Sequence, residues 1–290
     1  MQYTAKDLSS LYASVIAQQQ KLVIKVGTYV LTDQATGRLN EPKIEEIVTQ
    51  AAELYKAGKQ LALVTSGAVG AGKAEAEIDY DVKDMPLRQA LAAIGQPKLM
   101  ELYSTYFARH GIKTGQFLAS YDNLNDPEHK KNFMNTVKAL YSLGGIPILN
   151  ENDPFSTKEL ETANGGNGWG KNRGSITFGD NDLLSVMAAE TLEAQVLFLL
   201  SEEKGLMDYA SNGKLHIVDD TEYAGQYVLE GTSKGGAGGM KSKFESIARA
   251  ADSGIFVVLL SGLEENGILR VMQGEPLGTL FLPKNFKYTA

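Results

Sequence analysis

Short apolar runs recur along this chain, and segments with helical periodicity separate them. Runs such as Lys21–Val26 and Gln195–Leu200 have the length of strands that are buried on both faces of a sheet. Strands that alternate with helices pair in parallel and carry helices on both faces. The chain is therefore predicted to form an α/β fold with a central, mainly parallel sheet. The predicted strands are 21–26, 60–65, 112–119, 146–150, 195–200, 255–260 and, at an edge, 278–283.

Capping residues and apolar spacing predict the helices. Asn40 is a candidate N-cap before Pro42, and the helical spacing that follows ends at Gly58. A helix over 87–110 is expected to break or kink at Gly95-Gln96-Pro97, because proline removes a helical hydrogen bond. Residues 1–20 are mildly amphipathic and predict a helical extension that packs on a single domain over 21–283. Further helices are predicted over 127–143, 180–193 and 240–251.

Composition narrows the classes of function. The net charge of the 290 residues is −7, and no basic stripe indicates nucleic-acid binding. The chain has no cysteine, which excludes disulfides, zinc–thiolate sites and thiol catalysis. No apolar run approaches the ~18 residues of a membrane span, and the start lacks the layout of a secretion signal. A cytoplasmic protein with neither membrane nor nucleic-acid partners is predicted.

Polar segments lie at the ends of several predicted strands. Lys25 lies within the first strand before Gly27-Thr28, and Ser66-Gly67 follows the second. Asn150–Asp153 and Ser201-Glu202 stand at the ends of two others. Ligand sites in such sheets collect at the carboxyl ends of the strands, so these segments should converge on one edge. Their mixture of lysines, amides and carboxylates suits the passage of a phosphoryl group between two anions.

A glycine-rich segment, 235–239, precedes a predicted helix. Its glycines allow several backbone N–H groups to point at one anion, and the helix begins there with its positive end. Lys243 falls in the first helical turn, with Lys234 and Lys241 close by. A lysine there opposes the helix dipole, and phosphate binding would explain that cost. The alternative is a flexible, solvated basic loop.

The segment Gly67–Lys73 almost matches the P-loop pattern. Gly-x4-Gly-Lys follows a predicted strand, but Ala74 stands where that motif needs a hydroxyl for magnesium. We interpret its small residues as allowing a helix to pack close to the sheet. Backbone amides near Ser66 and Gly67 that hold a carboxylate are a further alternative.

Two acidic-amide clusters, 150–153 and 179–182, carry the remaining polar signal. Each consists of residue types that also serve in turns and caps. Together they offer enough polar groups to grip an amino-acid zwitterion, to orient lysines or to reach a metal.

In these motifs and in their order over 21–283, the chain resembles the amino-acid kinase family, most of all its members that phosphorylate glutamate. The resemblance implies a three-layer αβα sandwich. A lobe of about 21–175 would bind glutamate and a lobe of about 176–283 would bind ATP. The matching segments are Lys25-Val26-Gly27-Thr28, Val64-Thr65-Ser66-Gly67-Ala68, Gly115-Gln116, Ile148–Asp153, Gly179–Asp182 and Gly238–Lys243.

The implied reaction is ATP-dependent phosphorylation of the side-chain carboxylate of L-glutamate, the first step towards proline. Lys25 and Lys243 would stabilise the transferred phosphoryl group, and Asp182 would hold both lysines. Magnesium would be held by the ATP phosphates, with no direct protein ligand. Glutamate would contact Ser66, Gly67, Asp153 and Asn181. ATP would contact Lys25, Ser201, Glu202, Ala237, Gly238, Gly239, Met240, Lys241, Ser242 and Lys243.

Three alternatives to this reaction remain. A related enzyme would act on N-acetylglutamate, aspartate or a phosphate monoester. A binding protein would keep the fold without catalysis. A P-loop ATPase would use Lys73.

The chain also departs from the family pattern. Ser201-Glu202 stands where the family usually has Thr-Asp, and the segment after Asp153 is longer than usual. This segment, 154–175, is rich in glycine, contains Trp169, and is expected to form a lid over glutamate. Many bacterial members carry a C-terminal PUA domain, and a form without that domain is expected here. The family commonly forms dimers or tetramers, so a homo-oligomer is expected, with a reductase that consumes the labile product as a possible partner.

Overall fold

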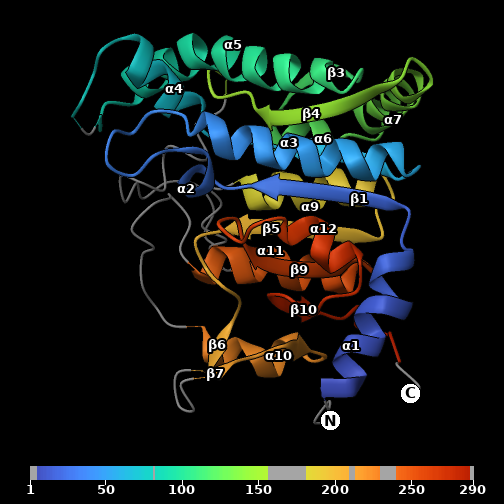
Figure 1. Ribbon diagram of the computed structural model, residues 1–290. Coiled ribbons are helices and arrows are strands. Elements are labelled where there is room, and N and C mark those ends of the chain that lie inside the picture. Colours follow the sequence, from blue (N-terminus) through green and yellow to red (C-terminus); the bar gives the residue numbers. More distant parts are fainter. Residues whose placement is uncertain (1–4, 81, 156–180, 209–212, 229–239, 288–290) are drawn as a thin grey trace.

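The computed structural model describes residues 5–80, 82–155, 181–208, 213–228 and 240–287 (Figure 1). Within these ranges, eight strands form one sheet in the order β3-β4-β2-β1-β5-β9-β10-β8. Neighbouring strands are parallel except for the pair β9 and β10, which confirms the predicted α/β fold with a mainly parallel sheet. The strands are β1 (Lys21–Val26), β2 (Gln60–Val64), β3 (Lys113–Ala119), β4 (Gly145–Glu151), β5 (Val196–Ser201), β8 (Ile217–Val218), β9 (Phe256–Ser261) and β10 (Thr279–Phe281), with a separate pair β6 (Met207–Asp208) and β7 (Gly213–Lys214).

Helices cover both faces of the sheet; Figure 1 shows α3 on one side of β1 and α9 on the other. The short helices α2, α6, α10 and α12 were not predicted, because four to six residues leave little periodicity to detect. The helices are α1 (Ala5–Ser14), α2 (Thr28–Leu31), α3 (Glu41–Lys56), α4 (Ala68–Glu75), α5 (Met85–Arg109), α6 (Tyr121–Asn125), α7 (Pro127–Ser142), α9 (Asn181–Thr191), α10 (Thr221–Ala224), α11 (Met240–Asp252) and α12 (Gly267–Met272), with 3-10 turns η1 (Ile16–Gln18) and η2 (Gly225–Tyr227).

The central strand β1 separates two hydrophobic cores. Leu22, Ile24 and Val26 belong to the core that includes side chains of α1, α3, α5 and α12. Val23 belongs to the opposite core, built with α6, α9 and α11. Because side chains alternate along a strand, Lys25 lies on the same face as Val23, towards α9. This alternation brings a lysine from the middle of the sheet to the start of α9.

The N-terminal helix packs into the first of these cores. Leu11, Tyr12 and Ile16 are fully buried, and the Tyr12 hydroxyl donates a hydrogen bond to the Leu277 carbonyl at 2.9 Å. Burial raises the pKa of this phenol above its ordinary value. Within the described ranges, no helix is both long and apolar enough to cross a membrane.

Two expectations about individual elements were wrong. Of the break or kink expected at Pro97, the break is absent: helix α5 continues through Pro97, because buried residues on either side of the proline, Leu91 and Leu99 among them, anchor the helix in the fold. Strand β10 is not at the edge, because β8 pairs with it through Ile217 and Val218 on its outer side. Two residues are too few to show the alternation that predicts a strand.

The small residues of α4 pack against α5, whereas we expected them to pack against the sheet. A Cβ atom on Gly72 would lie 1.8 Å from the Leu91 carbonyl oxygen, and one on Gly95 would lie 2.0 Å from the Ala68 carbonyl oxygen. The two helix backbones therefore touch directly. This contact explains Gly67–Lys73 without any phosphate, since Gly72 is a packing residue and Lys73 falls in the last turn of α4.

Gly72→Ala should strongly destabilise the fold, because the new methyl group would force α4 away from α5. Overpacking of this kind typically costs about 1–3 kcal/mol, and a backbone clash places this site at the upper end. Gly225→Ala is the matched control, since its added Cβ would meet only Phe244 at 3.7 Å. Urea unfolding of both variants measures the difference; equal stabilities would contradict the proposed helix contact.

Candidate active site

Two lysines from distant parts of the chain meet at one carboxylate. The Lys25 Nζ lies 2.7 Å from the Asp182 Oδ1, and the Lys243 Nζ lies 3.2 Å from the Asp182 Oδ2. Lys25 comes from β1, Asp182 from the first turn of α9, and Lys243 from the first turn of α11. Of the three side chains, Lys243 is the most accessible, with 11% of its side chain exposed against 3% and 1% for Lys25 and Asp182.

Burying these three charged side chains costs desolvation free energy, and removing any one of them destabilises the fold. Desolvation of buried charges is offset only by close pairing, and removal of one partner of a buried pair typically costs about 3–5 kcal/mol. The first turn of α9 favours the negative charge of Asp182 through the helix dipole. The cluster carries two positive charges and one negative charge. It therefore presents a net positive field at the carboxyl edge of the sheet, where an anion would be attracted.

A chain of buried amides runs beside this cluster. The Asn181 Nδ2 lies 2.8 Å from the Thr65 carbonyl oxygen, 3.0 Å from the Ser66 Oγ and 3.0 Å from the Asn150 Oδ1. The Asn150 Nδ2 in turn donates to the Gln96 Oε1 at 2.7 Å. The amide chain thus links the ends of β2 and β4 to α5 on one side of the sheet and α9 on the other.

One partner fixes the direction of the whole amide chain. The Thr65 carbonyl can only accept, so the Asn181 amide must turn its nitrogen towards it. The Asn150 oxygen must then face Asn181, and its nitrogen must face the Gln96 oxygen. As a result, the Asn181 Oδ1 and the Gln96 Nε2 are buried without a hydrogen-bond partner among the described residues. Such atoms are rare in proteins and mark places where a ligand or water completes the structure.

A buried acidic pair follows β4. Asp153 is 7% exposed and Glu151 is 2% exposed. Burial, and then the nearby charge of Glu151, raise the pKa of Asp153 to about 7, so this carboxyl group titrates near neutral pH. The Gln89 Nε2 donates to the Asp153 backbone carbonyl at 3.2 Å and steadies the segment from α5. A cationic ligand group beside Asp153 would restore its ordinary acidity.

Ser66 and Gly67 connect β2 to α4. Ser66 is buried with its hydroxyl 3.0 Å from Asn181, and Gly67 is the N-cap of α4 with a left-handed φ of 96°. That conformation suits glycine and turns the chain sharply beside the amide chain. All four residues expected to contact glutamate, Ser66, Gly67, Asp153 and Asn181, therefore lie at the carboxyl edge of the sheet.

The structure describes only some of the residues that were expected to bind ATP. Ser201 and Ser261 end neighbouring strands in register, so their hydroxyls belong to the same edge as Lys25. Glu202 is exposed. Met240, Lys241 and Ser242 open α11, with Lys241 exposed, whereas Ala237, Gly238 and Gly239 lie outside the described residues. The lid expected over 154–175 also falls outside them from residue 156 onward.

Gly27 was marked in the sequence only as part of the segment that follows Lys25, and Gln96 was not predicted as a site residue. Gly27 donates its N–H to the Leu200 carbonyl at 3.0 Å, and a Cβ there would lie 3.1 Å from that oxygen and 3.7 Å from the Lys25 Nζ. Gln96 appeared only as part of an expected helix break. Its signal was an amide on the buried face of the helix, which Gln96 shares with Ala92 and Leu99.

Comparison with known proteins places this geometry in a family. The model of the amino acid kinase family matches residues 20–261, most of the chain. The chain belongs to the amino acid kinase family. Among curated relatives, it is 37% identical to a glutamate 5-kinase of Clostridium acetobutylicum over 276 residues, covering 93% of this chain and 97% of the relative. It is 35% identical to a glutamate 5-kinase of Methanococcoides burtonii, covering 94% and 70% of the two chains.

Solved structures show the same amino acid kinase fold at low sequence identity. A UMP kinase from Bacillus anthracis superposes with a TM-score of 0.58 and 13% identity, covering 92% of this chain and 97% of that one. An N-acetylglutamate synthase from Neisseria gonorrhoeae gives a TM-score of 0.64 at 13% identity, covering 96% and 63%. At this identity the likeness concerns the fold alone, and the fold predicted from the sequence agrees with it.

Asp153→Asn should make the protein more stable at neutral pH. The pKa of Asp153 rises from 3.8 in the unfolded chain to about 7 in the fold, so the folded state holds its proton longer. The carboxyl group's contribution to stability is therefore complete below about pH 4 and is lost as pH rises through 7. Between these two values the free energy of unfolding falls as pH rises, because the folded state binds the proton that the unfolded state has released. The asparagine variant lacks this loss.

Urea unfolding between pH 4 and 8 measures the effect. The stability difference between wild type and Asp153→Asn should grow with pH in favour of the variant. Asp79→Asn, at an exposed position, is the control and should leave the pH profile unchanged. A constant difference across this range would contradict the raised pKa.

Proposed function

We propose that this chain transfers the γ-phosphoryl group of ATP to the side-chain carboxylate of L-glutamate, giving L-glutamyl 5-phosphate, the first step towards proline. The observation that carries the proposal is the meeting of Lys25 and Lys243 at Asp182 on the carboxyl edge of the sheet. The glutamate 5-kinases that share 35–37% identity with most of this chain support the choice of substrate.

The reaction depends on electrostatic stabilisation of negative charge more than on proton transfer. A glutamate side-chain carboxylate is already ionised at neutral pH and needs no general base. The obstacle is repulsion between this anion and the triphosphate, together with the charge that spreads over the transferred phosphoryl oxygens. Lys25 and Lys243 supply fixed positive charge at that point, and Asp182 holds both ammonium groups in place before the substrates arrive.

The donor set fits a magnesium ion carried by the nucleotide. Each oxygen of Asp182 faces a lysine, so this carboxylate is committed to orienting the two ammonium groups. Magnesium keeps most of its waters and usually binds through substrate phosphates, where it neutralises negative charge. The role of the chain is to position the phosphates beside Lys25 and Lys243.

The amide chain and Asp153 suit the amino-acid end of glutamate. The Asn181 Oδ1 is a buried acceptor without a partner in the described residues, and Asp153 is a carboxyl group that gains from a nearby cation. An α-ammonium group would satisfy both. The Ser66 hydroxyl, at 3.0 Å from Asn181, adds a further polar group to this end of the site. The acyl phosphate formed is labile, which favours a reductase that consumes it directly.

Lys243→Ala should lower kcat by about 10²–10³-fold, because one group that stabilises the transferred charge is lost. Lys243 suits this test because it is more exposed than Lys25, so its removal disturbs folding less. Glutamate-dependent ADP release, with circular dichroism to check the fold, is the measurement.

Lys73→Ala is the matched control for that experiment. Lys73 would be essential in a P-loop ATPase and should leave kcat unchanged here. Near-normal turnover of Lys243→Ala would overturn the phosphate assignment. A small panel of acids, including N-acetylglutamate and aspartate, tests the substrate in the same assay. Ligand-induced stabilisation without any ADP release would indicate a binding protein.

Gln96 should act as a positioning residue for glutamate through Asn150. In Gln96→Leu the Asn150 amide loses the acceptor that fixes its direction, and Asn181 loses its orientation in turn. Loss of one such hydrogen bond, about 1–1.5 kcal/mol, should raise the KM for glutamate roughly tenfold while the KM for ATP stays near normal.

Gln96→Glu separates this role from simple packing, because glutamate keeps an oxygen for the Asn150 Nδ2. Steady-state kinetics of both variants should show a KM for glutamate close to wild type in Gln96→Glu and a raised one in Gln96→Leu. If both variants lose stability and keep the same KM, Gln96 serves the fold alone.

A further inference from the structure

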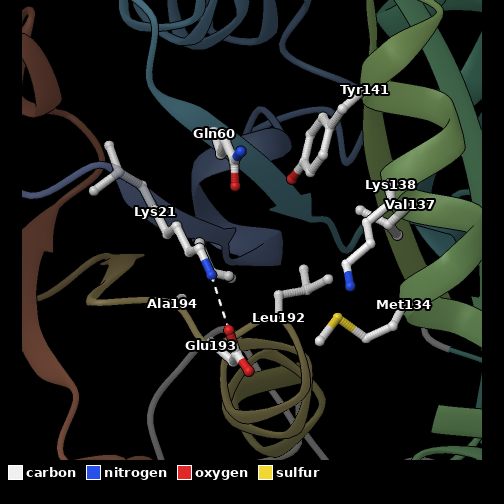
Figure 2. Close-up of a pocket in the computed structure, with 11 residues that line it drawn as sticks. Lys21, Gln60, Met134, Val137, Lys138, Tyr141, Leu192, Glu193 and Ala194 are labelled. Atoms are coloured by element: carbon white, nitrogen blue, oxygen red, sulfur yellow. Dashed lines mark hydrogen bonds and ion pairs between the residues drawn. The ribbon is translucent and has the colours of Figure 1, made fainter. Parts of the chain in front are cut away.

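A cleft lies at the opposite end of the central strands from the lysine cluster. It has a volume of about 270 Å³ and opens between α7 and the end of α9 (Figure 2). Lys21 and Gln60, the first residues of β1 and β2, form part of its rim, which places it at the amino ends of these strands. The residues that line it are Lys21, Leu22, Val23, Gln60, Met134, Val137, Lys138, Tyr141, Leu192, Glu193 and Ala194.

The charges of this cleft are unbalanced. Lys21 and Glu193 form an ion pair, with the Lys21 Nζ 2.9 Å from the Glu193 Oε2. The hydrogen bond and charge of Lys21, and to a smaller extent the charge of Lys138, hold the pKa of Glu193 below its ordinary value. The Lys138 side chain extends into the space between α7 and α9 in Figure 2, and its ammonium group forms no hydrogen bond or ion pair with the residues that the structure describes. Two ammonium groups thus lie near one carboxylate that pairs with only one of them, and the excess positive charge favours an anionic ligand.

The walls of the cleft are apolar. Val23, Met134, Val137 and Leu192 surround the space, and methionine adapts its shape readily to a ligand. The Tyr141 hydroxyl donates to the Leu61 carbonyl at 2.8 Å, so its ring presents mainly a carbon surface. A positive charge at the rim and an apolar interior together fit a small molecule with one acidic group and a compact hydrocarbon body, of about ten non-hydrogen atoms in this volume.

The end of α9 is joined to the start of β1 beside the cleft. Glu193 follows α9 in a left-handed conformation with a φ of 53°, and the Ala194 N–H donates to the Ala189 carbonyl at 2.8 Å, which is a common way for a helix to end. The Glu193 side chain forms the ion pair with Lys21, and the Gln195 N–H donates to the Lys21 carbonyl at 2.8 Å.

Two elements run from this cleft to the lysine cluster. Strand β1 begins at Lys21 and carries Lys25 near its other end, and α9 carries Asp182 at its start and ends next to Leu192. The length of α9, about 16 Å at 1.5 Å per residue, separates the two sites. A molecule wedged between β1, α7 and α9 would therefore act on both elements that set the contact between Lys25 and Asp182.

We propose that this cleft is an effector site for a small amphipathic carboxylate, with the carboxylate at Lys138 and the hydrocarbon body against Met134, Val137 and Leu192. Occupancy shifts the relative placement of β1 and α9 and thereby changes the rate of phosphoryl transfer. Only the change in rate rests on the function proposed above; binding to the cleft does not.

Phenylacetate is the probe, and the methyl group of Met134 is the reporter. In protein labelled with ¹³C-methyl methionine, loss of one signal in Met134→Leu identifies the reporter peak. Phenylacetate should shift that peak saturably, with a Kd on the order of 1 mM for a ligand of this size. Phenylacetamide has the same shape without the charge and should bind at least tenfold more weakly.

Lys138→Gln should weaken phenylacetate at least tenfold, whereas Lys131→Gln, an exposed lysine on the same helix that does not line the cleft, should leave it unchanged. Three results would overturn the site. They are equal binding of phenylacetate to Lys138→Gln and wild type, equal binding of phenylacetamide and phenylacetate, and no shift of the Met134 peak at a phenylacetate concentration roughly tenfold above the expected Kd.

Glutamate-dependent ADP release tests the coupling. Saturating phenylacetate should change kcat/KM at least twofold in wild type and Lys131→Gln and leave Lys138→Gln unaffected. A saturable Met134 shift with an unchanged rate would overturn the coupling. Absence of ADP release in every protein would count against the proposed function instead, since the binding measurement needs no turnover.

Discussion

The site depends on a single carboxylate that faces two ammonium groups. Asp182 is almost completely buried, and its two oxygens point at Lys25 and Lys243. Without Asp182 the lysines would repel each other, and without the lysines its charge would be stranded away from water. The three side chains come from β1, α9 and α11, so the contact also fixes how these elements meet. Sheet geometry places Lys25 there, because it follows Val23 by two residues and therefore lies on the same face, which α9 covers.

Much of the polar structure at this edge opposes folding. Asp153 is held near Glu151 with a raised pKa, and the Asn181 oxygen is buried without a partner among the described residues. Groups of this kind lower the stability of the ligand-free protein and are retained where a bound ligand supplies the missing hydrogen bonds or charge. The apolar cores on both faces of the sheet supply the stability that allows such an edge to exist.

The sequence predicted the sheet well because its buried strands are short, apolar and separated by clear helices. The sequence also predicted that one edge of the sheet would hold Lys25, Ser66, Asp153 and Ser201, since the carboxyl ends of parallel strands lie at the same edge. It could not reveal the two-residue β8, nor the role of Gln96, whose partner Asn150 lies 54 positions away. The break predicted at Pro97 was wrong for a related reason. Local sequence rules predict that a helix ends at an internal proline, but tertiary packing keeps α5 continuous. Contacts between distant residues decide these features, and no local pattern records them.

The arrangement of neighbours around β1 bears on how the protein can be made. This central strand pairs with β5 through Leu22 and Val196, and Tyr12 closes against Leu277, 265 positions later. During synthesis β1 can pair early with β2, but β1 and α1 leave the ribosome long before β5 and Leu277 exist. The apolar surface of these first elements therefore stays exposed, or bound by chaperones, and is fully buried only when nearly the whole chain has emerged. Folding on the ribosome is consequently expected to finish late, and truncation near the end of the chain would undo its beginning.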